Sequence, residues 1–393
     1  MKLQFRTFSA LLSVSIAAGV IAEVKPPTFR PVDIDTKVKI GYGLAIADVD
    51  GDRKDDILLV DKDIVAWYRN PGWEKFVMVE KLTDRDHVCI DAGDIDGDGK
   101  AEVAVGAQWN PGDTVNSGSV HYLIAPEDRT QLWTPVKLPN EPTVHRMRWM
   151  QGKSGQSELV VVPLHGRGNK GGKGAGVRVL AYQVPPDPAQ DAWKTSLIDD
   201  NMHLTHNFDP VNWLESTGDE ILLAGKEGVF LVTPQPSGWQ RRHLSSNGAG
   251  EVRHGILPSR SKFFAAIEPM HGNQIVVYSP RDANDLASFW RRTVVDDTLL
   301  AGHAVATGDL LRTGSDQLVV GWRGLRGTDR VGIKLYIPLD SSGSQWQTVL
   351  VDDNQMACED LKLADLNGDQ RLDIIAAGRR TKNLKVYFNE GAQ

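Results

Sequence analysis

One short pattern recurs along the chain and restricts its fold more than any other feature. An aromatic residue opens an alternation of apolar and polar residues, and a polar residue follows at a nearly fixed interval. The clearest copies are FRPVDIDTKVKIGY from Phe29, WKTSLIDDNMHLTH from Trp193, WRRTVVDDTLLAGH from Trp290 and WQTVLVDDNQMACE from Trp346. Looser copies begin at Phe76, Trp133 and Trp239, which makes seven repeats. Such internal repetition indicates a repeat architecture.

Each repeat continues with the pattern of further short strands. A strand follows the polar residue, then a turn, a second strand such as DILLV or EVAVG, and usually a third such as GVFLV or LKVYF. Four strands in roughly 45–60 residues are the make-up of one propeller blade. We therefore predict an all-β fold, a seven-bladed β-propeller.

The two ends of the chain complete each other in this scheme. The first repeat starts with an isolated strand near Phe29, and the last ends after its third strand, NLKVYFNE. We predict that the N-terminal strand completes the last blade, because closure removes the exposed edges of an open array. No long linker separates the repeats, so one propeller is expected over residues 23–393.

Residues 1–22 have the layout of a secretory signal peptide. Lys2 and Arg6 precede an apolar stretch that ends in small residues around Ala22. The competing interpretation is a membrane anchor, but the stretch contains serines and is short for a bilayer span of roughly 20 residues. We expect a periplasmic or secreted protein with no membrane span after cleavage.

The net charge limits the classes of binding partner, and the positions of the two cysteines indicate whether they form a disulfide. A net charge of -7 and a pI near 5.8 argue against nucleic acid or an anionic membrane as the main partner, because both select basic surfaces. Cys89 and Cys358 fall in blades that are not neighbours, and we expect two buried thiols. The oligomeric state is not predicted.

Three first hairpins carry an acidic turn, at residues 48–56, 94–102 and 365–373. Oxygen ligands at positions one, three and five, a glycine and a carboxylate at position nine suit Ca²⁺, although an Asx-turn without an ion is the alternative. The spacing resembles the FG-GAP or VCBS-type repeat loops of integrin-like propellers. The expected calcium ligands are Asp48, Asp50, Asp52 and Asp56, then Asp94, Asp96, Asp98 and Glu102, and finally Asp365, Asn367, Asp369 and Asp373.

Polar residues gather at the opposite end of the innermost strands. Alignment of the repeats on the first strand gives a first set, which consists of Tyr42, His87, His145, His206, His254, His303 and Glu359. Second strands run antiparallel and end on the same face. They supply a second set that includes Trp109, His165, His271, Arg323 and Arg379 or Arg380.

Clustered imidazoles are electrostatically unfavourable unless a metal or an anion compensates them. For a single histidine, a hydrogen-bonded channel residue is the simpler interpretation. Three neutral imidazoles around an open position are, however, the ligand type of a catalytic zinc site. Adjacent blades supply His206, His254 and His303, and we predict that these three bind Zn²⁺.

The other members of the two sets favour a carbohydrate ligand. The guanidinium groups of Arg323 and Arg379 suit an anionic or carbonyl-bearing group, and Trp109 offers a face for a sugar ring. We expect His87 and His271 to contact the same substrate. No nucleophilic Ser or Cys accompanies a His and an acid in this ring, which disfavours hydrolysis through a covalent intermediate.

Several segments resemble the propeller portion of aldos-2-ulose dehydratases and their bacterial relatives. They are AGHAVATGDL, QLVVGWRG, GIKLYIP, MACEDLKLADLNGD and DIIAAGRRTKNLKVYFNE, and the likeness is strongest over residues 290–393. The resemblance implies a metal-dependent lyase that removes water from a keto-sugar such as 1,5-anhydrofructose. It also implies a zinc site at the channel, matched to His206, His254 and His303 with His145 and His165 nearby.

Elimination next to a carbonyl needs a base, an electrophile and an acid. We expect zinc as the electrophile, His145 or His165 as the base, Tyr42 or Glu359 as the proton donor and Arg323 as the orienting group. A 3-keto-glycoside is a second type of substrate.

Other functions remain open from the sequence. The alternatives are a uronate polysaccharide lyase, a non-catalytic FG-GAP module that binds glycans or proteins, and a redox propeller that uses pyrroloquinoline quinone.

Overall fold

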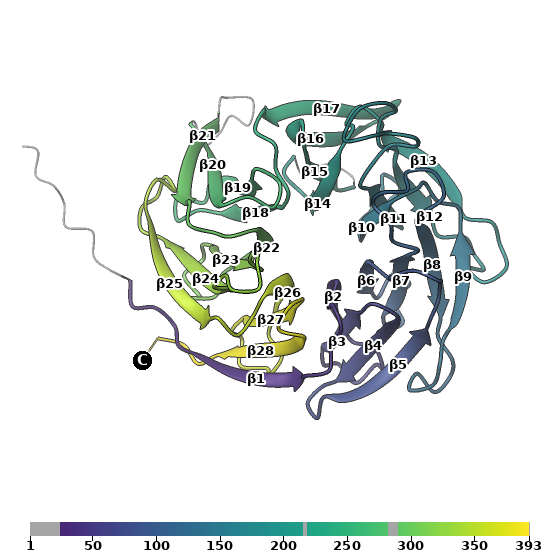
Figure 1. The fold of residues 1–393 in the computed structure, drawn as a ribbon, viewed down its shortest axis with the longest axis horizontal. Helices are drawn as coiled ribbons and strands as arrows, with labels where there is room; N and C mark the ends of the chain where they lie inside the picture. Colours follow the sequence, from purple (N-terminus) through teal and green to yellow (C-terminus); the bar gives the residue numbers. More distant parts are fainter. Residues whose placement is uncertain (1–23, 215–217, 282–289, 393) are drawn as a thin grey trace, which may run out of the picture.

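The computed structural model describes residues 24–214, 218–281 and 290–392. These residues contain strands and no helix, and the strands form seven four-stranded antiparallel sheets. Figure 1 shows the sheets arranged around a common centre as the blades of a propeller. The predicted fold class is therefore confirmed.

Each blade has an innermost, a second, a third and an outermost strand. The innermost strands are β2 (Gly43–Ala47), β6 (Cys89–Gly93), β10 (Val144–Gln151), β14 (Thr205–Val211), β18 (Val252–Ile256), β22 (Gly302–Gly308) and β26 (Cys358–Ala364). The second strands are β3 (Asp56–Val60), β7 (Glu102–Ala107), β11 (Ser157–Pro163), β15 (Glu220–Gly225), β19 (Lys262–Glu268), β23 (Gln317–Trp322) and β27 (Asp373–Gly378).

The outer half of each blade follows the same order. The third strands are β4 (Ile64–Arg69), β8 (Ser119–Ile124), β12 (Val179–Gln183), β16 (Gly228–Gln235), β20 (Gln274–Pro280), β24 (Gly332–Pro338) and β28 (Asn383–Asn389). The outermost strands are β5 (Glu74–Glu80), β9 (Thr134–Leu138), β13 (Lys194–Asp199), β17 (Gly238–Ser245), β21 (Trp290–Asp296), β25 (Trp346–Asp353) and β1 (Phe29–Asp35).

Burial explains the composition of the second strands. Every residue of β3, β7, β15 and β27 is buried, because neighbouring blades cover both faces of these strands. A continuous apolar run such as ILLV is the sequence form of a strand with two covered faces. The outermost strand β25 has a mixed pattern of half-buried and exposed residues, as its alternating sequence predicts.

The ring closes through the pairing of β1 with β28. The two strands are antiparallel, with Phe29 opposite Asn389 and Val32 opposite Val386, and the last blade has the order β1-β28-β27-β26. This confirms the predicted closing strand. The closure gives β28 a partner that the C-terminal repeat does not supply.

Four innermost strands begin with a β-bulge. The register shifts by one residue at the start of β10, β14, β22 and β26. The residues that have no partner in the second strand are His145, His206, His303 and Glu359. A bulge frees one residue from the ladder and redirects its side chain, here at the mouth of the channel.

The two cysteines and the N-terminal segment were also subjects of prediction. Cys89 and Cys358 are free and buried, as predicted, and burial raises the pKa of Cys89 to about 12. The described part of the chain has no helix long and apolar enough to cross a membrane. The predicted signal peptide, residues 1–22, lies outside the described residues.

Candidate functional site

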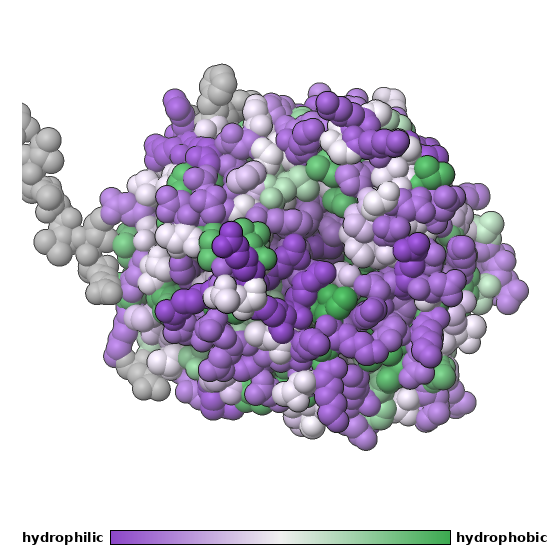
Figure 2. Space-filling view, in the orientation of Figure 1, coloured by the Kyte–Doolittle hydropathy of each residue, from purple (hydrophilic) through white to green (hydrophobic). Residues whose placement is uncertain are grey.

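A pocket of about 380 Å³ opens where the innermost strands begin. Figure 2 shows one face of the ring, which is largely hydrophilic and hollowed at its centre. The pocket is lined by Tyr42, Val88, Trp109, Pro111, His145, Arg146, Leu164, His165, Leu204, His206, Met270, His271, His303, Arg323, Glu359 and Arg379. Both predicted polar sets are therefore represented in one cavity.

Three histidines from adjacent blades meet in this pocket. His206 and His303 are bulge residues, whereas His271 follows β19 with a φ of 50°. One ring nitrogen from each of the three lies within 4.8 Å of the others. The closest pair is Nε2 of His271 and Nε2 of His206, 2.7 Å apart. This spacing suits three imidazole ligands of one metal ion.

Backbone carbonyls orient two of these rings. Nδ1 of His206 lies 2.9 Å from the carbonyl oxygen of Gly250 and 3.2 Å from a carboxylate oxygen of Glu251. Nδ1 of His303 lies 2.6 Å from the carbonyl oxygen of Glu359. A carbonyl oxygen only accepts, so Nδ1 carries the proton and Nε2 keeps its lone pair in both rings.

The trio is neutral because it is buried. Burial lowers the pKa of His271 to about 2, and the pKa of His303 falls well below its usual value through burial and the positive charge of Arg323. Burial also lowers the pKa of His206, although its contact with Glu251 opposes the shift. Neutral imidazole is the form that binds a metal ion.

His145 lies next to the trio without a partner for Nε2. Its ring is stacked on Trp109, with centroids 4.9 Å apart and planes at 16°, and is 4.7 Å from the ring of His206. On the other edge, Arg146 approaches Nδ1 to 3.3 Å. Among the described residues Nε2 of His145 has no hydrogen-bond partner and is buried, as is Nδ1 of His165 in the same pocket.

Glu359 connects two arginines at the rim. One carboxylate oxygen accepts a hydrogen bond from Arg323 at 2.8 Å, and the other accepts from Arg379 at 2.9 Å. The guanidinium group of Arg379 also lies 5.4 Å from the centroid of the Tyr42 ring. Because Glu359 is engaged as an acceptor on both oxygens, the geometry favours an orienting role over that of a proton donor.

The Tyr42 hydroxyl points to a different carboxylate. It donates a hydrogen bond of 2.9 Å to Asp86, and burial together with this bond raises the pKa of Tyr42 above its usual value. A protonated phenol in the pocket leaves Tyr42 as the better placed of the two expected proton donors.

Two residues of the first predicted set do not reach the pocket. His254 lies in β18, where Asp209 accepts hydrogen bonds from its backbone nitrogen at 2.9 Å and from its Nδ1 at 2.7 Å. The predicted trio is therefore not brought together, and His271 takes the expected place of His254. His87 is fully buried, with Nε2 facing the backbone nitrogen of Leu82, and Val88 lines the pocket in its place.

Two residues of the site, Glu251 and Arg146, were not predicted from the sequence. Glu251 is buried against His206, and its other oxygen accepts a hydrogen bond from Asn207. Burial opposes its ionisation, but the contacts with His206 and the nearby arginines lower the pKa of Glu251 overall. A signal was present, since Glu251 follows Gly250 as His303 follows Gly302.

The acidic turns lie at the other end of the innermost strands, as expected. Carboxylate oxygens lie within 4.8 Å of one another in two of them, in the groups Asp48, Asp50, Asp56 and Asp94, Asp96, Glu102. Backbone N–H groups already donate to carboxylates of these turns. The carboxylate of Asp48 accepts hydrogen bonds from the backbone nitrogens of Gly51 and Arg53, both at 2.7 Å. In the third turn, Asp365 accepts from Gly368 and Gln370 in the same way.

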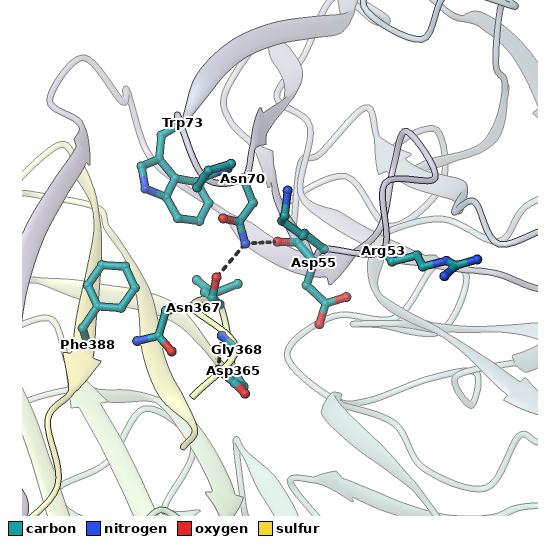
Figure 3. A pocket seen from close by; sticks show the side chains of 11 residues that line it. Arg53, Asp55, Asn70, Trp73, Asp365, Asn367, Gly368 and Phe388 are labelled. Carbon is teal, nitrogen blue, oxygen red and sulfur yellow. Dashed lines mark hydrogen bonds between the residues drawn. The ribbon is translucent and has the colours of Figure 1, made fainter. Parts of the chain in front are cut away.

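A second hollow, of about 470 Å³, separates the turns of the first and last blades (Figure 3). The side chain of Asn70 joins its walls, with hydrogen bonds to the carbonyl oxygens of Asp55 at 3.0 Å and Leu366 at 2.8 Å. Trp73 and Phe388 lie on the side of the hollow that faces away from Arg53. Among the described residues, no histidine lines this hollow, so the imidazole cluster belongs to the opposite face and only oxygen ligands are offered here.

Comparisons with known proteins agree with the motifs. A family model described as "Aldos-2-ulose dehydratase, beta-propeller domain" matches residues 117–281, in the middle of the chain rather than over residues 290–393. Models of the FG-GAP-like repeat and the FG-GAP repeat match residues 48–105 and 90–123. The predicted resemblance to both groups is confirmed.

A curated relative and a solved structure extend the comparison. The chain is 24% identical over 346 residues to aldos-2-ulose dehydratase of Phanerodontia chrysosporium, which covers 79% of this chain and 37% of the relative's length. A chain in the "Crystal Structure of Mitotic Checkpoint Complex" matches with a TM-score of 0.59 at 11% identity, over 98% of this chain and 99% of that one. The second likeness shows the fold alone.

Proposed function

We propose that this protein is an exported, metal-dependent carbon-oxygen lyase that eliminates water or an alcohol from a keto-sugar. 1,5-anhydrofructose and 3-keto-glycosides are the substrate types that we propose. The observation that carries the proposal is the convergence of three neutral imidazoles in an open pocket that is also lined by two further histidines and three arginines. The match to the dehydratase propeller supports the same class of reaction.

His206, His271 and His303 are the proposed ligands of a zinc ion. The donor set fits this metal, because it consists of three nitrogen ligands beside an open position. The Nε2 lone pairs of His206 and His303 are available, since their Nδ1 atoms face carbonyl oxygens. A bound zinc ion would supply a Lewis acid for the carbonyl oxygen of the substrate.

We propose His145 as the base. Its Nε2 has no partner among the described residues, and its pKa lies well below the usual value through burial and the charge of Arg146. A neutral imidazole accepts the proton from the carbon next to the substrate carbonyl. The electron pair of that C–H bond forms the new C=C bond as the C–O bond to the leaving group breaks.

The rim supplies the other roles. Tyr42 is the proposed donor of the proton that the leaving oxygen takes, and Asp86, which holds its hydroxyl, positions it. Arg323 and Arg379, fixed by Glu359, orient the hydroxyl and carbonyl groups of the sugar. Trp109, stacked on His145, offers an apolar wall to the sugar ring.

The second candidate is a non-catalytic binding module, which the matched FG-GAP repeats favour. It predicts affinity for glycans or proteins that does not depend on a transition metal. For either function we propose Ca²⁺ in the turns that contain Asp48 and Asp94, where it would stiffen the hairpins.

The test combines a product assay with metal analysis. Purified protein is offered 1,5-anhydrofructose, 3-keto-glycosides and uronate polymers, and absorbance in the near ultraviolet is followed because elimination creates a conjugated C=C bond. We expect a rise with a keto-sugar and about one zinc per chain. Silence across all the substrates, together with calcium as the only bound metal, contradicts the lyase and supports the binding module.

A further inference from the structure

We propose that a groove beside the histidine pocket binds an anionic group of the saccharide, so that, among the proposed substrate types, a keto-glycoside with a carboxylate or a sulfate next to its reacting sugar binds better than the neutral 1,5-anhydrofructose. The inference deepens the proposed function and rests on its assignment of the pocket to a sugar. It adds a subsite and a substrate class to that assignment.

The groove is continuous with the pocket. It has a volume of about 540 Å³ and is lined by His271, Ala301, Arg323, Gly324, Leu325, Arg326, Gly327, Arg379 and Arg380. His271, Arg323 and Arg379 line both cavities. A saccharide whose reacting sugar lies against the histidines therefore extends its next group or residue between the arginines.

The groove carries an excess of positive charge. It contains four arginines, and Glu359 forms ion pairs with two of them, Arg323 and Arg379. Among the described residues no carboxylate lies within ion-pair distance of Arg326 or Arg380. Asp329, the acid of the adjoining loop, accepts from the backbone nitrogens of Leu325 and Arg326, at 2.8 and 2.7 Å. These two hydrogen bonds lower the pKa of Asp329, and the charges of Arg326 and Arg380 help to lower it. Four guanidinium groups therefore face two carboxylates, and an anion that enters the groove meets a net positive charge.

The loop that presents Arg326 is already held in place. Arg380 donates hydrogen bonds to the carbonyl oxygens of Arg326 and Asp329, the second at 2.6 Å. The backbone nitrogen of Gly324 donates to the carbonyl oxygen of Leu300 at 2.8 Å. Preorganisation of this kind reduces the entropic cost of binding. The Arg326 guanidinium itself stays exposed and available to a ligand.

Leu325 adds a contact suited to a sugar. Its side chain is 75% exposed at the edge of the groove, where an aliphatic group can cover the C–H face of a pyranose ring. Guanidinium groups bind planar carboxylates through paired hydrogen bonds, and they also bind sulfates. The shared chemistry is an anionic sugar, and the two anions are separated by experiment.

The experiment measures equilibrium binding with the Arg326→Ala variant of the full chain. The probes are an oligogalacturonate, a sulfated oligosaccharide of equal length and a neutral oligosaccharide of equal length, each titrated calorimetrically. Arg330→Ala is the matched control, because Arg330 lies on the same loop but is paired with Asp353 and does not line the groove. We expect Arg326→Ala to weaken one anionic probe about tenfold or more, as for a lost charge-assisted hydrogen bond.

Comparison of the probes decides between the outcomes. The neutral probe is expected to bind equally to the wild type and both variants, and the affinity of the anionic probe is expected to fall with added salt less steeply in Arg326→Ala. The probe that loses affinity identifies the anion as a carboxylate or a sulfate. Equal binding of all probes to the wild type, or equal losses in Arg326→Ala and Arg330→Ala, overturns the inference.

The result is independent of the proposed reaction. Turnover of a neutral keto-sugar by a protein that has no preference for anionic probes sustains the lyase and removes the subsite. Loss of anionic binding in Arg326→Ala, without turnover of any substrate, sustains the subsite and removes the lyase.

Discussion

His271 owes its position to a backbone conformation that few residues adopt. Its φ of 50° is in the left-handed region, which histidine enters more readily than branched or bulky residues. The chain turns there directly after β19 and brings the imidazole against His206, with ring planes at 85°. One loop residue thereby completes a cluster whose other two members stand on innermost strands.

The proposed zinc site predicts different effects for two histidines. His271→Ala removes a ligand, and we expect the zinc affinity to fall at least 100-fold, since loss of an outer-shell partner alone costs about 10–100-fold. His254→Ala is the control, because His254 lies outside the cluster and pairs with Asp209. Metal content after dialysis against a zinc buffer measures both.

The same measurement distinguishes the ligand set predicted from the sequence, which includes His254, from the set seen in the structure, which includes His271. Loss of zinc in His254→Ala with retention in His271→Ala would contradict the proposed ligand set and restore the set predicted from the sequence.

The His254–Asp209 pair predicts a pH dependence of stability. Burial opposes the charge of His254, but its hydrogen bond to Asp209 and the nearby charge of Asp316 raise its pKa overall. Burial likewise opposes the charge of Asp209, but the hydrogen bond to His254 and the charge of Arg253 lower the pKa of this carboxyl overall. A raised histidine pKa stabilises the fold fully below the unfolded value of about 6.5, and a lowered carboxyl pKa stabilises it above about 3.9.

The contribution of the pair is therefore largest between these two values and is lost as the pH rises through the folded pKa of His254. We expect at most about 1 kcal/mol, because the histidine side chain is 42% exposed and solvent screens the pair. Urea unfolding of wild type and Asp209→Asn at pH 5 and pH 9 measures it. A difference between the proteins that is equal at both pH values contradicts this account.

At the scale of the element, the bulges decide which residues the pocket receives. Where the interval from the aromatic residue is regular, as for His206, His303, Glu359 and Tyr42, the sequence alone predicts the pocket residue correctly. In the repeat that begins at Trp239, the ring position comes one residue earlier, at Glu251, whereas the sequence pattern points to the more conspicuous His254. The loop between two strands has no regular alternation of apolar and polar residues. A difference of one residue in its length therefore cannot be recognised from the sequence.

Gly321 in the second strand β23 packs closely against the innermost strand β26 of the next blade, which leaves no room for a side chain. A Cβ added at Gly321 of β23 would lie 2.3 Å from Sγ and 2.5 Å from Cβ of Cys358, the residue just before the bulge of β26. We expect Gly321→Ala to lower the free energy of unfolding by about 1–3 kcal/mol through overpacking. Chemical denaturation measures this change.

Gly93→Ala is the matched control, because nothing lies within 4 Å of a Cβ at that strand glycine. The double variant Gly321→Ala, Cys358→Ala is expected to recover part of the loss, since it removes the sulfur that clashes. Equal stability of Gly321→Ala and Gly93→Ala would contradict the packing argument.

At the scale of the whole molecule, stability depends on closure of the ring. The outline of that ring was predictable, because seven aromatic-led strands, the first of them an isolated N-terminal strand, are visible in the sequence. The histidine cluster was predictable only in part: His206 and His303 were expected, but His271 was not assigned to it, because residues far apart in sequence meet only after closure fixes the angle between blades. His206 and His271, whose Nε2 atoms lie 2.7 Å apart, come from different blades.

Removal of residues 1–35 deletes β1 and exposes the edge of β28. We expect lower cooperativity of thermal unfolding and concentration-dependent association, since an open strand edge pairs with other chains. Calorimetry and size-exclusion chromatography measure these effects. Removal of residues 1–23 keeps β1 and is the control. A peptide of residues 29–35 is expected to restore the monomer, and unchanged behaviour of the shorter chain would show that β1 does not secure the ring.

The bulges have a consequence for how such a protein can change its chemistry. His145, His206, His303 and Glu359 have no partner in the second strands, so the blade does not use their side chains to hold its own register. A different residue at any of these positions leaves the ladder intact. Substitutions at these four positions can therefore change or abolish the chemistry of the pocket, while the propeller fold stays the same.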